Sequence, residues 1–229
     1  MIKRALILIV VAVAGWFLIS FTASVPEQET LPLLAEQYVS QGAGRVGSAN
    51  IVTAVVVTFR GLDTLGEVAV LFIATAGIGF LMRLDTDKGK RRTRTPASEL
   101  LQTGSGFLIP LIILFGVYIF LHGHLTPGGG FQGGVVIASA VLLMLLARTD
   151  PRINHTMLRA VESLSGAFYV GIGVLGLILA AGFLDSRILP AGTLGALASA
   201  GAIPVIYSLI GLKVGSELVS ILDTLHNAE

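Results

Sequence analysis

Two ionisable residues lie in the middle of an apolar stretch near the C-terminal end of the sequence. Lys213 and Glu217 are four residues apart within Ala202–Leu222, so a helix would place both on one face. Charge is costly inside a membrane, and ionisable residues there tend to mark ion or proton paths. A buried lysine also shifts its pKa readily, which suits proton transfer. The pair therefore predicts an ion or proton path. The alternatives are a structural pair that docks this helix on a neighbour and a helix whose inner end already lies among the lipid headgroups.

A second acidic position occurs in the first third of the chain. Glu67 enters the apolar run Leu65–Met82 and follows Asp63 by four residues. Asp63 is a plausible N-cap for that helix, and Arg60 is a plausible surface partner for it. Both carboxylates are ion-path candidates, although acidic residues also favour a helix N-terminus simply because the helix dipole stabilises anions there.

A glycine-rich segment interrupts the apolar sequence at 122–134. His122 and His124 could titrate near neutral pH, and they are further path candidates beside the alternative of hydrogen-bonded interface residues. The rest of the segment predicts tight turns and close helix approach, through Pro127, Gly128, Gly129, Gly130, Gly133 and Gly134. It does not match a phosphate-binding loop, because no Gly-Lys-Ser/Thr follows.

The sequence gives little indication of metal binding, hydrolysis or electron transfer. The chain has no cysteine and only four histidines, and no His/Asp/Glu cluster has the spacing of a metal site. No hydrolase arrangement is present, and Glu162 is interpreted as a solvated or capping residue. We therefore expect no catalytic residues, no metal and no cofactor, so any electron transfer would belong to a partner. The net charge of +1 gives no indication of nucleic-acid binding.

The elements that carry these residues are predicted to be membrane helices. Apolar residues make up 54% of the chain and charged residues 13%, about half the roughly 25% of a soluble domain. The fold class is an all-α polytopic bundle of about six spans in the lipid bilayer. The predicted spans are Ala5–Val25, Leu65–Met82, Gly104–Leu121, Val135–Ala147 (which must borrow residues from the glycine segment), Leu164–Leu184 and Ala202–Leu222.

Three stretches leave the span count open. Ala5–Val25 follows Lys3 and Arg4 and could be a signal peptide, although it is longer than a usual signal core. Residues 50–60 are too short to cross and could be interfacial or re-entrant. Residues 31–38 could form one helical turn, and Pro110 is expected to kink the third span.

The distribution of basic residues predicts the orientation. With the N-terminus inside, the inner flanks hold eleven Lys and Arg, six of them in the run 83–94, whereas the outer loops hold three. Lys and Arg are enriched on the cytoplasmic side, so both termini are expected in the cytoplasm and the protein in the cytoplasmic (inner) membrane. The basic run also divides the chain into modules 1–95 and 96–229.

Three segments carry a resemblance to known families. The sequence HGHLTPGGGFQGG at 122–134 resembles the B subunit of Mrp-type multisubunit Na+/H+ antiporters, and IPVIYSLIGLKVGSE at 203–217 is similar to that family's last helix. In the first module, NIVTAVVVTFRGLDTLGE at 50–67 resembles the C-terminal end of the A subunit, which stands alone as the small E subunit of membrane-bound hydrogenases. Thr58 stands where the family usually has an acidic residue, which puts any role of that position in doubt.

The resemblance implies a subunit of an ion-translocating module that exchanges Na+ for H+ beside other membrane subunits. It also implies that Glu67 and Lys213 line a polar axis while the glycine segment packs the core. Because both modules lie in one chain without the large antiporter-like part, a ferredoxin-driven hydrogenase-like or sulfur-reductase-like complex is favoured as host. The alternatives are a stand-alone antiporter and a structural subunit that bridges antiporter-like and redox parts without moving ions. A free-standing transporter ranks last, because the two modules show no internal repeat.

Overall fold

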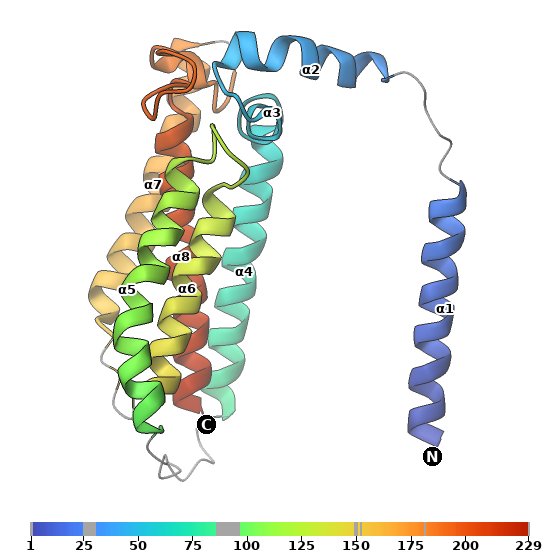
Figure 1. Cartoon of the computed structure of the whole chain (residues 1–229), viewed down its shortest axis with the longest axis vertical. Coiled ribbons are helices and arrows are strands. Elements are labelled where there is room, and N and C mark those ends of the chain that lie inside the picture. Colours follow the sequence, from blue (N-terminus) through green and yellow to red (C-terminus); the bar gives the residue numbers. More distant parts are fainter. Residues whose placement is uncertain are drawn as a thin grey trace. The chain divides into compact units, whose positions relative to one another are not determined.

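The computed structural model describes residues 2–24, 31–85, 97–148, 151, 153–180 and 182–228. Every regular element in these ranges is helical, and six of the helices are long and apolar enough to cross a membrane (Figure 1). The chain is a polytopic membrane helix bundle, as its hydropathy predicts. It divides into two compact units, residues 1–37 and 38–229.

The first unit consists of one apolar helix and the start of a second. Helix α1 (Ile2–Ser24) corresponds to the first predicted span, and its described side chains are nearly all exposed. Helix α2 (Leu33–Val46) begins in this unit and continues into the second. The sequence indicated a single turn at 31–38, which is too short. The apolar residues beyond that turn allow the helix to continue, and Gly42 packs against Ile51 and Ala54.

A break in regular helix geometry precedes the second long helix. Helix α3 (Ile51–Thr53) starts at Asn50, whose side chain accepts a hydrogen bond from the Thr53 N–H. It runs into a π-helix, η1 (Ala54–Phe59), which ends at Arg60 before α4 (Gly61–Asp85) begins. Asp63 was expected to be the N-cap of α4, and this is wrong, because the helix already begins at Gly61. Asp63 instead lies in the first turn.

The second unit is built around its last helix. Helices α5 (Glu99–Leu121), α6 (Gly130–Ala147) and α7 (His155–Leu179) all contact α8 (Ile203–Ala228), and so does α4. The long helices of this unit lie side by side in Figure 1. Their shared core includes Tyr169, Ile203, Ile206 and Ile210. The central position of α8 explains how it can carry a buried charge pair, because neighbouring helices cover it on several sides.

The start of the fourth span agrees with the sequence expectation, whereas both ends of the fifth span differ from it. Helix α6 begins at Gly130, so the fourth span does extend into the glycine segment. Helix α7 begins at His155 rather than near Leu164, because Asn154 caps it with hydrogen bonds from two backbone N–H groups. It ends at Leu179, and the loop that follows contains a short 3₁₀ helix, η3 (Ser186–Ile188). The basic run 83–94 lies largely outside the described residues.

Candidate functional site

The predicted Lys213–Glu217 pair forms within α8. The Lys213 Nζ lies 2.7 Å from the Glu217 Oε1. Lys213 is 8% exposed and Glu217 is fully buried. The separation is that of an ion pair, so the positive charge of Lys213 offsets the negative charge of the buried Glu217 carboxylate.

A second carboxylate approaches the same lysine from α7. The Glu162 Oε1 lies 3.5 Å from the Lys213 Nζ. The interpretation of Glu162 as a solvated or capping residue at the start of a span is wrong, because α7 starts at His155 and so places Glu162 two turns inside the helix, against α8. The result is a cluster of Glu162, Lys213 and Glu217, which we call the acid–lysine cluster.

The lysine of this cluster is confined on its remaining sides. Its Nζ lies 4.9 Å from the centroid of the Phe72 ring on α4, a cation–π contact. Gly166 of α7 lies beside the lysine side chain, since a Cβ there would be in ordinary van der Waals contact with the Lys213 Cε at 3.4 Å. Helices α4, α7 and α8 thus all contribute to the position of one ammonium group.

Glu67 is not part of the acid–lysine cluster. It lies on α4 with an exposed side chain, and no hydrogen bond or ion pair joins it to Lys213 within the described residues. Tyr169 on α7 is close enough to Glu67 for an electrostatic interaction, and the Tyr169 hydroxyl is buried without a hydrogen-bond partner in the described part of the chain. Asp63 pairs with Arg60, with the Arg60 Nε 2.6 Å from the Asp63 Oδ2, as the sequence predicts. Asp63 and Glu67 thus lie on a face that the described chain leaves open.

The two histidines occupy different surroundings in the connection between α5 and α6. The His122 ring stacks on Tyr118, with centroids 4.2 Å apart. His124 is fully buried, and its Nε2 lies 3.3 Å from the Ala196 carbonyl oxygen. Burial lowers the pKa of His124 below its ordinary value, and the Ala196 carbonyl opposes this only in part. His124 is therefore a neutral interface residue at neutral pH.

The glycine segment packs helices together. A Cβ on Gly133 would lie 2.6 Å from the Gly116 carbonyl oxygen of α5, and one on Gly134 would lie 2.9 Å from the Gly211 carbonyl oxygen of α8. Gly129 and Gly130 face Tyr207 and Ile210 in the same way. Close helix approach in membranes depends on such small residues.

A network of hydrogen bonds connects the segment at 48–53 with the segment at 122–126. The Ser48 hydroxyl donates to the His124 carbonyl at 2.9 Å, and the Asn50 side chain donates to the carbonyls of Gly123 and Thr126. The Thr53 hydroxyl donates to the Gly123 carbonyl at 2.6 Å and accepts from the Tyr207 hydroxyl at 3.0 Å. None of these residues is among the candidates that the sequence predicts. The cap signature at Asn50 could have placed a helix start there, but nothing local indicates a partner more than 70 residues away.

No group of three or more His, Cys, Asp or Glu side chains that could hold a metal ion occurs among the described residues. In the acid–lysine cluster the cation is the ammonium group of Lys213, which lies between the carboxylates of Glu162 and Glu217. Carboxylates in such a cluster can exchange protons or bind a monovalent cation.

The sequence matches two known families in consecutive segments. Residues 100–220 match the domain related to the MnhB subunit of Na+/H+ antiporters, and residues 2–96 match the MbhE family, the E subunit of MBH. An uncharacterized protein of Methanocaldococcus jannaschii is 32% identical over 212 residues, which cover 79% of this chain and 80% of that protein.

Solved structures agree with these matches. A chain of the membrane-bound sulfane sulfur reductase, an archaeal respiratory membrane complex, is 44% identical with a TM-score of 0.82, and the match covers 98% of both chains. A chain of the Mrp complex from Dietzia sp. has the same fold over 99% of this chain and 26% of its own length, with a TM-score of 0.79 and 22% identity. Since residues 100–220 are more than half of the sequence, the chain belongs to the family of membrane proteins related to the MnhB subunit of Na+/H+ antiporters.

Proposed function

We propose that this antiporter-type subunit works in the cytoplasmic membrane within a respiratory complex of the sulfane-sulfur-reductase or hydrogenase kind. In this proposal the acid–lysine cluster of Glu162, Lys213 and Glu217 moves a proton or Na+. The observation that carries the proposal is the ammonium group of Lys213, buried between two carboxylates on neighbouring helices. The match over 98% of both chains to a sulfane sulfur reductase chain supports the choice of host.

The charge of the cluster suits it to transport. Two carboxylates and one ammonium carry a net charge of −1 when all three are ionised, so the uptake of one proton or one monovalent cation neutralises the cluster. A proton arriving at Glu162 would weaken its attraction for Lys213 and leave the lysine to Glu217 alone. The flexible lysine stem allows such a change of partner without movement of the helices.

The exposure of the three groups indicates a direction of entry. The Glu162 side chain is 18% exposed, that of Lys213 10% and that of Glu217 0%. Glu162 is therefore the member that an ion or water from a neighbouring subunit reaches first. Glu67, which interacts electrostatically with Tyr169, is a second proposed point on this path, nearer the other end of the helices.

A structural subunit that moves no ions is the second candidate. The observation that favours it is the hydrogen-bond network between residues 48–53 and 122–126, which connects the segments matching the two families. A rigid bridge between antiporter-like and redox subunits would need such a connection. In that case the acid–lysine cluster would serve only to fix α7 against α8.

Transport by the assembled complex distinguishes the two candidates. We would measure Na+/H+ exchange in inverted vesicles for Glu162→Gln, Glu217→Gln and Glu67→Gln, with assembly checked by native gel electrophoresis. Glu99→Gln is the matched control, because Glu99 is exposed in the first turn of α5, away from the cluster. If the proposal holds, exchange is lost in the cluster variants and kept in the control. Unchanged exchange in all assembled variants would leave only the structural candidate.

A further inference from the structure

An aromatic side chain from a third helix lies against the ammonium group of the acid–lysine cluster. The Lys213 Nζ is 4.9 Å from the centroid of the Phe72 ring, within the roughly 6 Å over which a ring face attracts a cation. Phe72 belongs to α4, whereas the two carboxylates belong to α7 and α8. The cation is thus contacted from three helices, and the group that α4 contributes is uncharged.

This contact joins the two segments that match different families. Phe72 lies in residues 2–96, which match MbhE, and Lys213 lies in residues 100–220, which match the domain related to MnhB. The hydrogen bonds between residues 48–53 and 122–126 join the same two segments, but they involve no charged side chain. The Phe72 ring therefore connects the MbhE-like segment with the charged cluster of the other segment.

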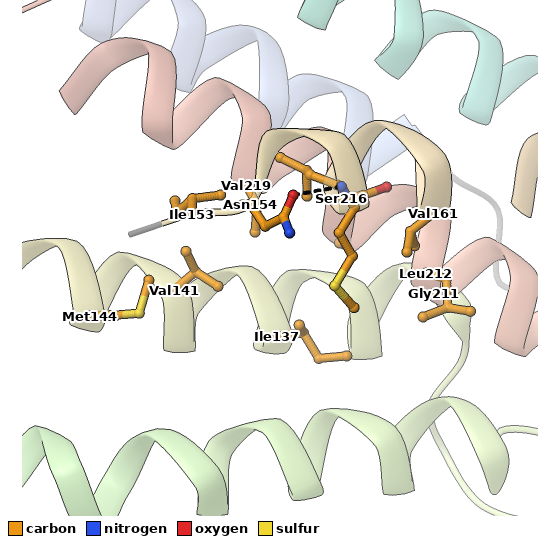
Figure 2. A pocket seen from close by; sticks show the side chains of 13 residues that line it. Ile137, Val141, Met144, Ile153, Asn154, Val161, Gly211, Leu212, Ser216 and Val219 are labelled. Atoms are coloured by element: carbon orange, nitrogen blue, oxygen red, sulfur yellow. Dashed lines mark hydrogen bonds between the residues drawn. The ribbon is translucent and has the colours of Figure 1, made fainter. Parts of the chain in front are cut away.

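A neighbouring face of α8 offers the lysine no polar partner. Figure 2 shows the apolar pocket between α6 and α7, which Ser216 of α8 helps to line. Neither Lys213 nor Glu217 lines this pocket. The Ser216 hydroxyl donates to the backbone carbonyl of Lys213 at 2.9 Å and not to a side chain of the cluster. Within the described residues, the charge of Lys213 therefore faces the two carboxylates and the Phe72 ring.

An aromatic ring differs from a carboxylate in its effect on a neighbouring lysine. The ring attracts the ammonium group through its quadrupole, but it cannot take up a proton, so this attraction stays the same whichever carboxylate is protonated. Phe72 is 50% exposed on a membrane-spanning helix, and a cation–π contact strengthens where water is excluded.

We propose that Phe72 is a positioning residue, whose ring holds the Lys213 ammonium group in place between Glu162 and Glu217 while the protonation of these carboxylates changes. The consequence for ion exchange rests on the function proposed above, whereas the holding of the lysine does not. The two parts therefore need separate measurements.

Ring fluorination tests the holding of the lysine with little change in the shape of the side chain. Fluorine withdraws electron density from the ring face, so phenylalanines with one, two and three ring fluorines at Phe72 should attract the lysine progressively less. We expect the unfolding temperature of the assembled complex to fall stepwise in the parent chain but not in Lys213→Met. Equal changes in both backgrounds would overturn the proposal, because the ring would then act through packing alone. The same series at Phe80, a 64% exposed ring of α4 without a cation contact among the described residues, measures the effect of fluorine itself.

Na+/H+ exchange in inverted vesicles measures the consequence for transport. Phe72→Leu should lower the exchange rate by about 2- to 30-fold, the change in population that loss of one cation–π contact produces. Phe72→Tyr keeps the ring and should retain exchange, and Phe80→Leu should leave it unchanged. An equal loss in Phe72→Tyr and Phe72→Leu would contradict the role of the ring.

The cluster variants separate a failure of this inference from a failure of the proposed function. Exchange that is lost in Glu162→Gln and Glu217→Gln but unchanged in Phe72→Leu would overturn the positioning role. If exchange is unchanged in all three variants, the proposed transport function fails. The holding of Lys213 by the ring is then still supported, provided that fluorination lowers the unfolding temperature only when the lysine is present.

Discussion

Lys213 is the only described cation that contacts the buried carboxylate of Glu217. A buried charge that loses its partner costs far more than the intact pair contributes. The acid–lysine cluster is therefore asymmetric: Glu162 is partly exposed and can be neutralised at little cost, whereas Glu217 depends on the lysine. The Glu217 side chain is 0% exposed, so water cannot reach the carboxylate and take the place of the lysine.

Lys213→Met should therefore destabilise the protein by about 3–5 kcal/mol, the usual cost of breaking a buried pair. Methionine keeps much of the side-chain volume, so the loss reports charge rather than packing. The double variant Lys213→Met with Glu217→Gln should recover most of the stability. Thermal unfolding of the purified complex, followed by size-exclusion chromatography, measures both effects. If the single variant were as stable as the parent, the ion pair would be contributing nothing.

His124 gives the protein a stability that depends on pH. Its pKa is lowered by burial from the ordinary value of 6.5, so the unfolded state binds a proton more readily than the folded state. The stability contribution is complete above about pH 6.5 and falls as the pH drops from there towards the folded pKa. Thermal unfolding at about pH 7.5 and about pH 5 should show this loss.

Two variants separate His124 from the other histidines. His124→Gln keeps a hydrogen-bond donor but cannot titrate, so its unfolding temperature should depend less on pH. His155→Gln should retain the pH dependence, because His155 is 60% exposed beside Asp223. The reverse result would assign the pH dependence to the start of α7 instead.

At the scale of the helices, the sequence predicts that a helix is present better than it predicts where the helix begins and ends. Six apolar runs give six helices, and the glycine segment supplies the start of α6 because its residues fit between α5 and α8. The start of α7 was missed by about two turns, since a polar helical turn looks like a loop until Asn154 is recognised as its cap. Nothing in the periodicity of 54–59 indicated a π-helix.

The same distinction applies to the candidate site. The pairing of Lys213 with Glu217 follows from helix geometry alone, because both lie on α8. Glu162 joins them only through the packing of α7 on α8, 51 residues away in sequence. The bonds from Asn50 and Thr53 to the 122–126 segment are likewise tertiary, and one sequence without its relatives carries no signal for them.

Gly134→Ala should separate α6 from α8. The added Cβ would lie 2.9 Å from the Gly211 carbonyl oxygen and from the Gly215 nitrogen, and these backbone atoms cannot turn aside as a flexible side chain can. Overpacking of this kind costs about 1–3 kcal/mol. Gly106→Ala on α5 is the control, because nothing lies within 4 Å of the added atom. Similar unfolding temperatures for the two variants would show that the helices have room to adjust.

On the scale of the whole molecule, the surface of the membrane-spanning helices includes an exposed charged side chain. Glu67 is exposed on a membrane-spanning helix, where an uncompensated carboxylate is unfavourable. The described side chains of α1 are almost all exposed as well. Contact with lipid is favourable for the apolar side chains of α1 but unfavourable for the carboxylate of Glu67. Neighbouring subunits are therefore expected along α4, in agreement with the multisubunit complexes that contain the structural relatives.

The excess of arginine and lysine on one side of the predicted spans, eleven against three, predicts that the C-terminus lies in the cytoplasm and the loop between α7 and α8 outside. The chain has no cysteine, so single cysteines report position without background from this subunit. In right-side-out vesicles, a membrane-impermeant maleimide should label Thr193→Cys in the exposed loop before lysis and Asn227→Cys at the exposed end of α8 only after lysis. Labelling of both positions before lysis would contradict the single crossing that α8 makes between them. Labelling in the opposite order would invert the orientation of the whole subunit.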